Sequence, residues 1–164
     1  MEVRRYLEKD KTELIELVAH FRTHLSSLKG ILRKPDMEQA LEEISEYLGK
    51  KYPIYVAEDT DRNDLLGYIV CRVDDTVVWA ESLYVKPTAR NRGVGNALYD
   101  KAEELCQGLG GDTLYNWIHP NNHTIVGFLK KRGYDVLNLV EVRKTRQGEE
   151  IEGNMQVGEH QFLY

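Results

Sequence analysis

The segment from Val85 to Gly95 combines residue types that can bind an anion through the main chain. It leaves an apolar, strand-like run and enters a helix-like run that begins near Val94. Gly93 and Gly95 let the backbone approach a ligand without a Cβ in the way, and N–H groups at a helix start lack intrahelical partners and carry partial positive charge. The pattern predicts a phosphate-binding loop at this strand-to-helix connection.

Two common phosphate-binding motifs do not fit this loop. The glycine pair is followed by Asn96-Ala97-Leu98, so the third glycine of a dinucleotide-binding GxGxxG motif is absent, and no Gly-Lys-Ser/Thr closes the loop as in a nucleotide P-loop. A tight turn alone would also favour glycines here. The full pattern, V-x-P-x-x-R-x-x-G-x-G, resembles the GNAT superfamily of N-acetyltransferases, whose acetyl-CoA pyrophosphate site has the form Arg/Gln-x-x-Gly-x-Gly/Ala.

A second segment supports the resemblance independently. Asn122 to Tyr134 is similar to a later helix of the family, written N-x-x-A-x-x-L/F-Y-x-x-x-G-F/Y. One position departs from it: Leu129 stands where the family often has a tyrosine that can protonate the departing thiolate of CoA. The resemblance spans roughly residues 1–145 and is strongest over residues 77–134.

The resemblance implies an acetyl-CoA-dependent N-acetyltransferase, with acetyl-CoA as co-substrate and without a metal. It implies direct transfer of the acetyl group to a primary amine of a protein, peptide or small molecule in a ternary complex. The residues expected to bind acetyl-CoA are Leu83, Tyr84, Val85, Arg90, Asn91, Arg92, Gly93, Val94, Gly95, Asn96 and Asn122. A non-catalytic acyl-CoA-binding regulatory module is the alternative, because of Leu129 and because a structural role for Glu81 is also open.

Three of these residues also have their own physical rationale. Arg90 and Arg92 flank the loop, where basic side chains gain charge-assisted hydrogen bonds to a pyrophosphate. Asn122 stands at the start of a predicted helix, so it can cap that helix with or without a ligand.

Glu81 is the candidate catalytic base. A lysine-type amine, with a pKa of about 10.4, is protonated near neutral pH and must lose a proton before it attacks a thioester. Period-2 alternation puts Glu81 on the strand face of Trp79, Leu83 and Val85, and the resemblance places that strand beside the acetyl group. A carboxylate in mid-strand can equally face solvent or bind a neighbouring backbone amide.

The resemblance also implies a bulge that separates this strand from the next one and frees amides near residues 83–85. Such main-chain donors stabilise a developing oxyanion by about 2.7–4 kcal/mol each, so the missing tyrosine weakens the mechanism without abolishing it. If a side-chain acid is needed, the candidates are His119, His123, Tyr84 and Tyr115.

Composition bounds the class of protein. The chain has 164 residues, 41% of them hydrophobic, which suffices for one domain with a sizeable core. No run approaches 18 apolar residues and Met1–Arg5 lacks an apolar signal-peptide region, so we expect a soluble cytoplasmic protein without a membrane partner. The net charge of −5 argues against a nucleic-acid partner. Cys71 and Cys106 are expected to be core thiols, neither disulfide-bonded nor metal-binding.

Local signals predict two helices and then a run of strands. Asp10 and Asp36 are expected to cap the two helices, the second of which ends at Gly49. The runs Ile54–Glu58 and Leu65–Val73 are typical of an antiparallel hairpin, and the strand that ends at Val85 continues the antiparallel order. A right-handed crossover through the helix at residues 94–106 then leads to a parallel strand, residues 113–118.

The C-terminal part is expected to complete the sheet. A helix from Asn122 to Arg132 precedes a strand region from Tyr134 to about Thr145. The predicted fold is α+β (α/β/α), with a mixed, mostly antiparallel central sheet of six or seven strands and helices on both faces. Residues 1–145 would form one GNAT-like domain. Residues 146–164, with four glutamates and one arginine, read as an acidic extension that is loose or folded onto a neighbour, as in a homodimer.

Overall fold

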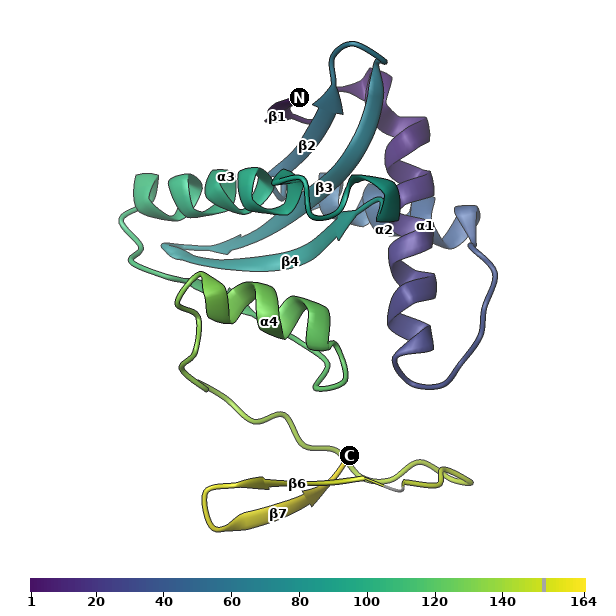
Figure 1. Cartoon of the computed structure of the whole chain (residues 1–164), viewed down its shortest axis with the longest axis vertical. Helices are drawn as coiled ribbons and strands as arrows, with labels where there is room; N and C mark the ends of the chain where they lie inside the picture. The colour runs from purple at the N-terminus through teal and green to yellow at the C-terminus, as the bar shows by residue number, and fades with distance from the viewer. Residues whose placement is uncertain (152) are drawn as a thin grey trace. The chain divides into compact units, whose positions relative to one another are not determined.

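The computed structural model describes residues 1–151 and 153–164, which form two compact units, residues 1–128 and residues 129–164 (Figure 1). The single domain expected over residues 1–145 stays a prediction. The strands of the first unit are β1 (Glu2–Arg5), β2 (Ile54–Asp59), β3 (Asp64–Asp74), β4 (Val77–Val85) and β5 (Leu114–Asn116). Its helices are α1 (Lys11–Ser27), α2 (Met37–Gly49), α3 (Val94–Gly108) and most of α4 (His123–Lys131), with 3-10 turns η1 (Glu8–Asp10) and η2 (Pro87–Ala89).

The sheet has the order β1-β2-β3-β4-β5. The first four strands pair antiparallel and β5 pairs parallel to β4, as expected for a crossover through α3. Five strands are fewer than the six or seven predicted. The strand expected over residues 134–145 is the missing part, because residues 134–146 have no regular secondary structure.

The core lies on the sheet face that α1 and α2 cover. Tyr68, Val70 and Tyr84 from the central strands pack with apolar side chains of both helices, among them Leu14 and Ile44. The helix α3 crosses the sheet on the other face (Figure 1). It buries one stripe of residues, Val94, Leu98, Tyr99, Ala102 and Cys106. The predicted arrangement of helices on both faces is therefore confirmed.

The two predicted N-caps have different outcomes. Asp36 caps α2 as expected, because its Oδ1 accepts from the backbone N–H of Gln39 at 3.0 Å. Asp10 stands at the N-cap position of α1 but makes no side-chain cap bond. Stronger partners engage its carboxylate: Arg4 donates to both oxygens, Nη1 to Oδ2 at 2.6 Å and Nη2 to Oδ1 at 2.8 Å. A bidentate charged contact therefore replaces the predicted cap.

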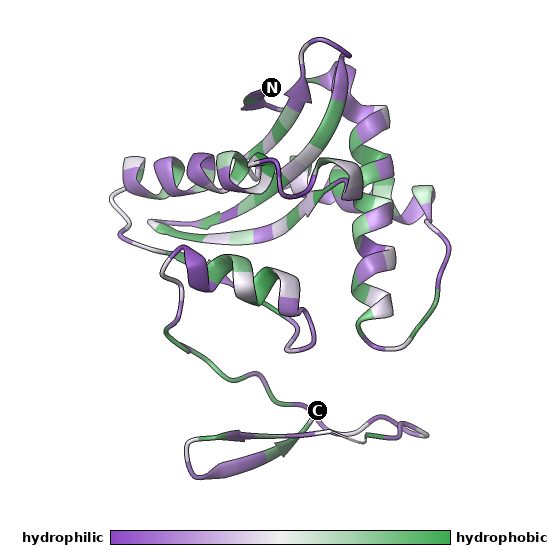
Figure 2. Cartoon of the chain, in the orientation of Figure 1, coloured by the Kyte–Doolittle hydropathy of each residue, from purple (hydrophilic) through white to green (hydrophobic). Residues whose placement is uncertain are grey.

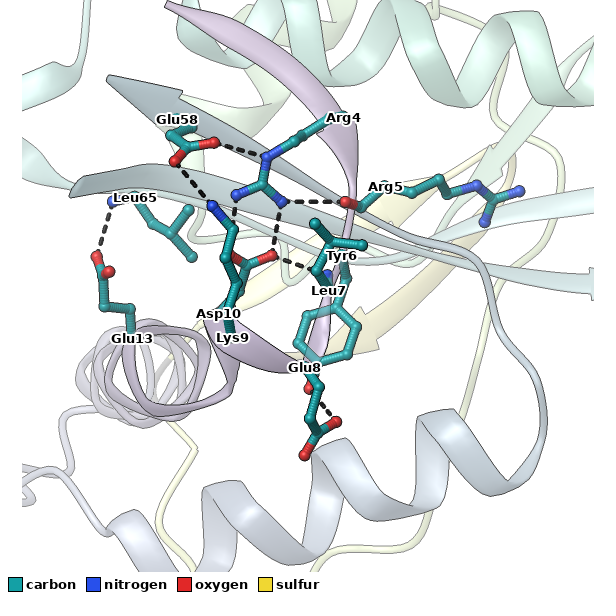
Figure 3. A network of polar contacts seen from close by, with 10 residues as sticks. All are labelled: Arg4, Arg5, Tyr6, Leu7, Glu8, Lys9, Asp10, Glu13, Glu58 and Leu65. Atoms are coloured by element: carbon teal, nitrogen blue, oxygen red, sulfur yellow. Dashed lines mark hydrogen bonds and ion pairs between the residues drawn. The ribbon is translucent and has the colours of Figure 1, made fainter. Parts of the chain in front are cut away.

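Asp10 belongs to a network that ties the N-terminus to the sheet (Figure 3). Its Oδ2 also accepts from the backbone N–H of Leu7 at 2.8 Å. Arg4 Nε also donates to Glu58 Oε2 at 2.6 Å, and Lys9 Nζ donates to Oε1 of the same carboxylate at 3.4 Å. Asp10 and Glu58 are both buried. Two cations therefore offset two buried carboxylates where β1, η1 and β2 meet.

We expect Asp10→Asn to lower the free energy of unfolding by about 1.5–3 kcal/mol at neutral pH, the usual loss for a hydrogen bond to a charged group. Burial alone would raise the pKa of Asp10, but the hydrogen bonds from Arg4 and Leu7 outweigh it and the pKa is lowered. The extra stability is thus present above the unfolded pKa of about 3.9 and is lost as pH falls through the folded pKa.

Urea unfolding over a pH series measures this difference. The difference in the free energy of unfolding between the parent and Asp10→Asn should be largest above about pH 5 and should disappear progressively below about pH 4. Asp61→Asn, in an exposed turn, is the matched control and should leave stability unchanged. If this difference in stability stayed the same at acid pH, the stabilising role of the ionised Asp10 carboxylate would be contradicted.

The second unit consists of the end of α4, the irregular segment 134–146 and a two-stranded antiparallel sheet. Its strands are β6 (Asn154–Val157) and β7 (His160–Leu163), joined at Gly158 with a φ of +60°. The expected acidic extension thus contains a hairpin. In the described parts of the chain, no helix has both the length and the apolar character needed to cross a bilayer.

Candidate active site

The strands β4 and β5 pair over three residues only. Val78, Trp79 and Ala80 lie opposite residues 114–116, and the pairing ends there, although β4 continues to Val85. The second half of β4 therefore has one edge paired with β3 and one edge that β5 leaves uncovered. This is the separation of strands that the family resemblance implied.

The direction of the backbone groups along this half of β4 alternates. The N–H of Lys86 donates to Leu66 of β3 at 2.9 Å, so the N–H and C=O groups of Val85 and Leu83 point the other way, toward the uncovered edge. The carbonyl of Val85 does face outward, since it accepts from Arg90 Nε at 3.1 Å. Tyr84 directs its own amide toward β3. Of the three predicted main-chain donors, Leu83 and Val85 are thus available on this edge.

A β-bulge lies at Glu81. On β3, Val70 pairs with Ser82 and the next residue, Cys71, pairs with Ala80, so Glu81 has no partner of its own. An extra residue of this kind bends a strand and increases its twist, and bulges often re-aim a side chain next to a functional site. The bulge stands directly after the last residue of β4 that pairs with β5.

The bulge overturns one step of the sequence argument. Strict alternation put Glu81 on the face of Trp79, Leu83 and Val85. Leu83 pairs with Ile69 and Trp79 pairs with Arg72, and positions 69 and 72 of β3 point to opposite faces. Trp79 and Leu83 therefore lie on different faces of the sheet, because one inserted residue shifts the period.

Glu81 associates with Arg72, a residue that the sequence analysis did not single out. Arg72 Nε lies 3.9 Å from Glu81 Oε2, and each side chain is 24% exposed. Glu81 Oε2 is buried and, among the described residues, has no hydrogen-bond donor. A buried carboxylate oxygen without a donor is rare and suits a group that must accept a proton. The sequence does contain a feature that could have drawn attention to Arg72, because it is the one charged residue inside the apolar run Leu65–Val73.

Aromatic rings hold Arg72 from two sides. Its guanidinium carbon lies 4.1 Å from the ring centroid of Trp79 and 4.3 Å from that of Trp117, both short enough for cation–π attraction. Tyr115 packs beside Trp79 with centroids 5.8 Å apart. Trp117 remains 65% exposed. These rings fix the cation that faces Glu81.

The loop before α3 has the backbone of an anion-binding turn. Asn91 has a φ of +58° and Gly93 a φ of +84°, two left-handed residues separated by Arg92. Turns that combine left- and right-handed residues point successive N–H groups into one concavity. Gly93 is the N-cap of α3 and supplies no capping side chain, and the first turn of α3 contains no acidic residue. Nothing in this turn neutralises the positive end of the helix.

The two glycines have different structural reasons. Gly93 has a left-handed backbone conformation, which favours glycine. Crowding is not the reason for glycine there, because an added Cβ would meet no atom within 4 Å. Gly95 lies inside the first helical turn, where an added Cβ would meet Phe128 at 3.7 Å and Val85 at 3.9 Å, which are ordinary contacts. Internal packing therefore does not demand glycine at position 95.

The basic and amide side chains predicted to bind acetyl-CoA are placed as follows. Arg92 and Asn91 are exposed in the loop, and Val94 is buried beneath it. The guanidinium of Arg90 is engaged by the Val85 carbonyl and lies 5.7 Å from the ring of Tyr84. Arg90 therefore braces the end of β4 against the loop, whatever else it binds.

Asn122 caps α4. Its Oδ1 accepts from the backbone N–H of Ile125 at 3.4 Å, and its backbone carbonyl accepts from Val126 at 3.1 Å. The alternative structural role is thus present, and any ligand contact would use the remaining amide group. Asn96 is exposed on the first turn of α3.

The four substitute acids lie in different surroundings. Tyr84 is buried in the core beside Phe21, with ring centroids 6.4 Å apart. His123 is exposed at the start of α4, and Tyr115 lies next to Trp79. Burial, together with the charge of Lys29, lowers the pKa of His119 below its ordinary value, so this imidazole is mainly neutral at pH 7.

Comparison with known proteins agrees with the geometry of this site. The family model of the acetyltransferase (GNAT) family matches residues 17–134. A peptidyl-lysine N-acetyltransferase, YjaB, of Salmonella typhimurium is 27% identical over 127 residues, which cover 77% of this chain and 80% of that protein.

Solved structures share the fold. A GNAT-family acetyltransferase from Staphylococcus aureus Mu50 has a TM-score of 0.63 at 22% identity, and the match covers 80% of this chain and 82% of that one. The aminoglycoside acetyltransferase AAC(6')-Iy, solved with a CoA-containing bisubstrate analogue, has a TM-score of 0.66 at 17% identity, covering 88% of this chain and 97% of that one.

Proposed function

Because the chain belongs to the acetyltransferase (GNAT) family, we propose that it transfers an acetyl group from acetyl-CoA to the side-chain amine of lysine in a protein or peptide. The single observation that carries the site assignment is the uncovered edge of β4, which lies next to the uncapped start of α3. The lysine acceptor is supported by the peptidyl-lysine acetyltransferase YjaB, to which the chain is similar. We also propose that the protein acts in the cytoplasm.

The loop over residues 90–95 suits the pyrophosphate of CoA. Left-handed residues at positions 91 and 93 turn backbone N–H groups inward, and the helix start adds partial positive charge. Arg92 is exposed and can add a charge-assisted hydrogen bond. The outward N–H groups of Leu83 and Val85 would bind the pantetheine arm and polarise the thioester carbonyl.

In the reaction, the acceptor ammonium first gives a proton to Glu81, directly or through a water. The free amine then attacks the thioester carbon, so that a C–N bond forms and the C–S bond breaks. The oxyanion that develops on the carbonyl is stabilised by main-chain donors of β4. The attacking nitrogen loses its second proton to water as the amide forms, and the departing thiolate of CoA takes up a proton from water or from a nearby acid, since Leu129 can supply none.

Direct transfer is favoured over a covalent cysteine intermediate. Burial raises the pKa of Cys71 to about 12, and burial also raises the pKa of Cys106. Both thiols therefore remain protonated near neutral pH, whereas a nucleophilic cysteine needs its thiolate. The two unpaired thiols also suit the reducing cytoplasm.

The test is an assay of the purified protein with acetyl-CoA and three acceptors: a lysine peptide with a blocked N-terminus, a lysine-free peptide with a free N-terminus, and an aminoglycoside. We expect release of free CoA and one added acetyl group on the lysine peptide. Acetylation of another acceptor alone would replace the proposed substrate class. Binding of acetyl-CoA without CoA release on any acceptor would favour the non-catalytic module.

A further inference from the structure

Two hydrophobic strands of the sheet each carry one charge away from their ends. β3 and β4 are mostly hydrophobic (Figure 2), and the charged residues inside them are Arg72 on β3 and Glu81 on β4. Arg72 pairs across the ladder with Trp79, so both side chains leave the same face of the sheet. The proposed reaction gives Glu81 a task but gives Arg72 none.

The guanidinium of Arg72 is held in place without being hydrogen-bonded. A guanidinium carries five N–H donors. Among the described residues, its contacts are the rings of Trp79 and Trp117 and the carboxylate of Glu81. The rings offer no lone pair to these donors, and the 3.9 Å from Nε to Glu81 Oε2 exceeds the length of a hydrogen bond. Because the side chain is 24% exposed, a ligand can reach the unused donors.

This cluster lies where β4 and β5 separate. Their pairing ends at Ala80 and Asn116, so Glu81 and Trp117 are the first residues beyond it. Trp117 is largely exposed, and its indole can pack against the aliphatic part of a bound side chain. A molecule whose amine reaches Glu81 therefore also comes close to the Arg72 guanidinium, which contacts both residues.

The charges at this position favour an acceptor that brings a carboxylate. When a lysine ammonium approaches Glu81, two cations, the ammonium and Arg72, face one carboxylate. The two cations repel each other, and this repulsion is stronger in a partly buried site than in water. A carboxylate on the acceptor would pair with Arg72, balance the charges, and leave the oxygens of Glu81 to the amine.

We propose that the Arg72 guanidinium binds a carboxylate of the acceptor, so that the preferred substrate is a lysine with glutamate or aspartate beside it in the sequence. This inference rests on the proposed acetyl transfer to lysine and names the class of substrate for that site. The planar guanidinium matches a carboxylate through two parallel N–H···O bonds, and the two tryptophan rings hold it ready for that contact.

The kinetic test compares two peptides with blocked termini, in which one lysine is flanked on both sides by glutamate or by glutamine. These peptides differ in charge and hardly in shape. We expect the KM for the glutamate peptide to be about tenfold lower, the usual effect of a charged hydrogen bond. The kcat should differ by less than about twofold, because the contact is the same before and during the reaction.

Arg72→Gln should raise the KM for the glutamate peptide to that for the glutamine peptide. Arg72→Lys keeps the charge without the planar geometry and should keep a smaller part of the preference. Arg5→Gln is the matched control, since Arg5 also lies over an aromatic ring, that of Tyr55 at 4.4 Å, but on β1 at the other edge of the sheet. It should keep the full preference. A merely structural Arg72 would lower activity on both peptides alike.

A binding measurement needs no acetyl transfer. Trp79 and Trp117 are the two tryptophans of the chain, so tryptophan fluorescence reports on this cluster. Titration with each peptide, with and without CoA, should give a saturable change of emission. The dissociation constant should be about tenfold lower for the glutamate peptide with the parent and equal for both peptides with Arg72→Gln. Circular dichroism checks that each variant is folded, and the parent and Arg72→Lys decide the question if Arg72→Gln is not.

The two measurements separate this inference from the proposed function. If no peptide is acetylated but the glutamate peptide binds in a manner that depends on Arg72, the acetyl transfer to lysine is wrong and the carboxylate site stands. If both peptides are acetylated with equal KM, the acetyl transfer stands and the carboxylate site is refuted. Equal or absent binding of the two peptides by the parent refutes it too, as does a preference that Arg72→Gln retains.

Discussion

Replacing Gly95 with valine is expected to raise the dissociation constant for acetyl-CoA at least tenfold, a loss of about 1.4 kcal/mol or more. An added Cβ at this position meets protein atoms only at 3.7 and 3.9 Å, which are ordinary contacts, and the backbone there is not left-handed. The methyl groups would instead occupy the space beside the first-turn N–H groups, where a pyrophosphate must approach the backbone closely. Isothermal titration with acetyl-CoA measures the effect.

Gly108→Val is the matched control for this experiment. Gly108 is the last residue of the same helix and has open space around an added Cβ. Its substitution brings the same change of residue type, from glycine to the better helix former valine. Its affinity for acetyl-CoA should equal that of the parent. Gly93→Val is a less clear test, because the left-handed φ of +84° makes any substitution there strained. A folded Gly95→Val protein with parental affinity would refute the anion-binding assignment.

Local signals predicted the first unit well because they act over few residues. The glycine-rich loop, the Asp36 cap and the start of α3 at Val94 each depend on short-range geometry, and the structure contains all three. Asp10 differs because its partner Arg4 is brought to it by β1. Competition between a cap bond and a bidentate salt bridge is decided by tertiary structure.

The bulge at Glu81 and the segment 134–146 show two further limits. A bulge inserts one residue into a ladder without a distinct sequence signal, so the prediction that Trp79, Glu81 and Leu83 share one strand face was wrong. The valine-rich segment has strand propensity, but a strand also needs a neighbour to bond with. Propensity alone predicted a sixth strand there, and the described chain provides no partner for it.

Substituting Glu81 by glutamine is expected to lower kcat by about 10²–10³-fold at pH 7, within the range for loss of a general base. The KM for acetyl-CoA should stay unchanged within roughly twofold, because Glu81 lies on β4 away from the loop at residues 90–95. Glutamine keeps the shape of the side chain and can still lie beside Arg72, so the fold should persist.

The pH profile separates a base from a merely structural residue. Without a base, the rate depends on the fraction of acceptor that is already uncharged, which rises about tenfold per pH unit below the amine pKa of about 10.4. The variant should therefore recover activity steeply between pH 7 and pH 9, whereas the parent should change less. Glu16→Gln, an exposed position on α1, is the control and should keep the parental profile. If Glu81→Gln keeps it too, another group or a water chain removes the proton, and the buried oxygen of Glu81 serves only its contact with Arg72.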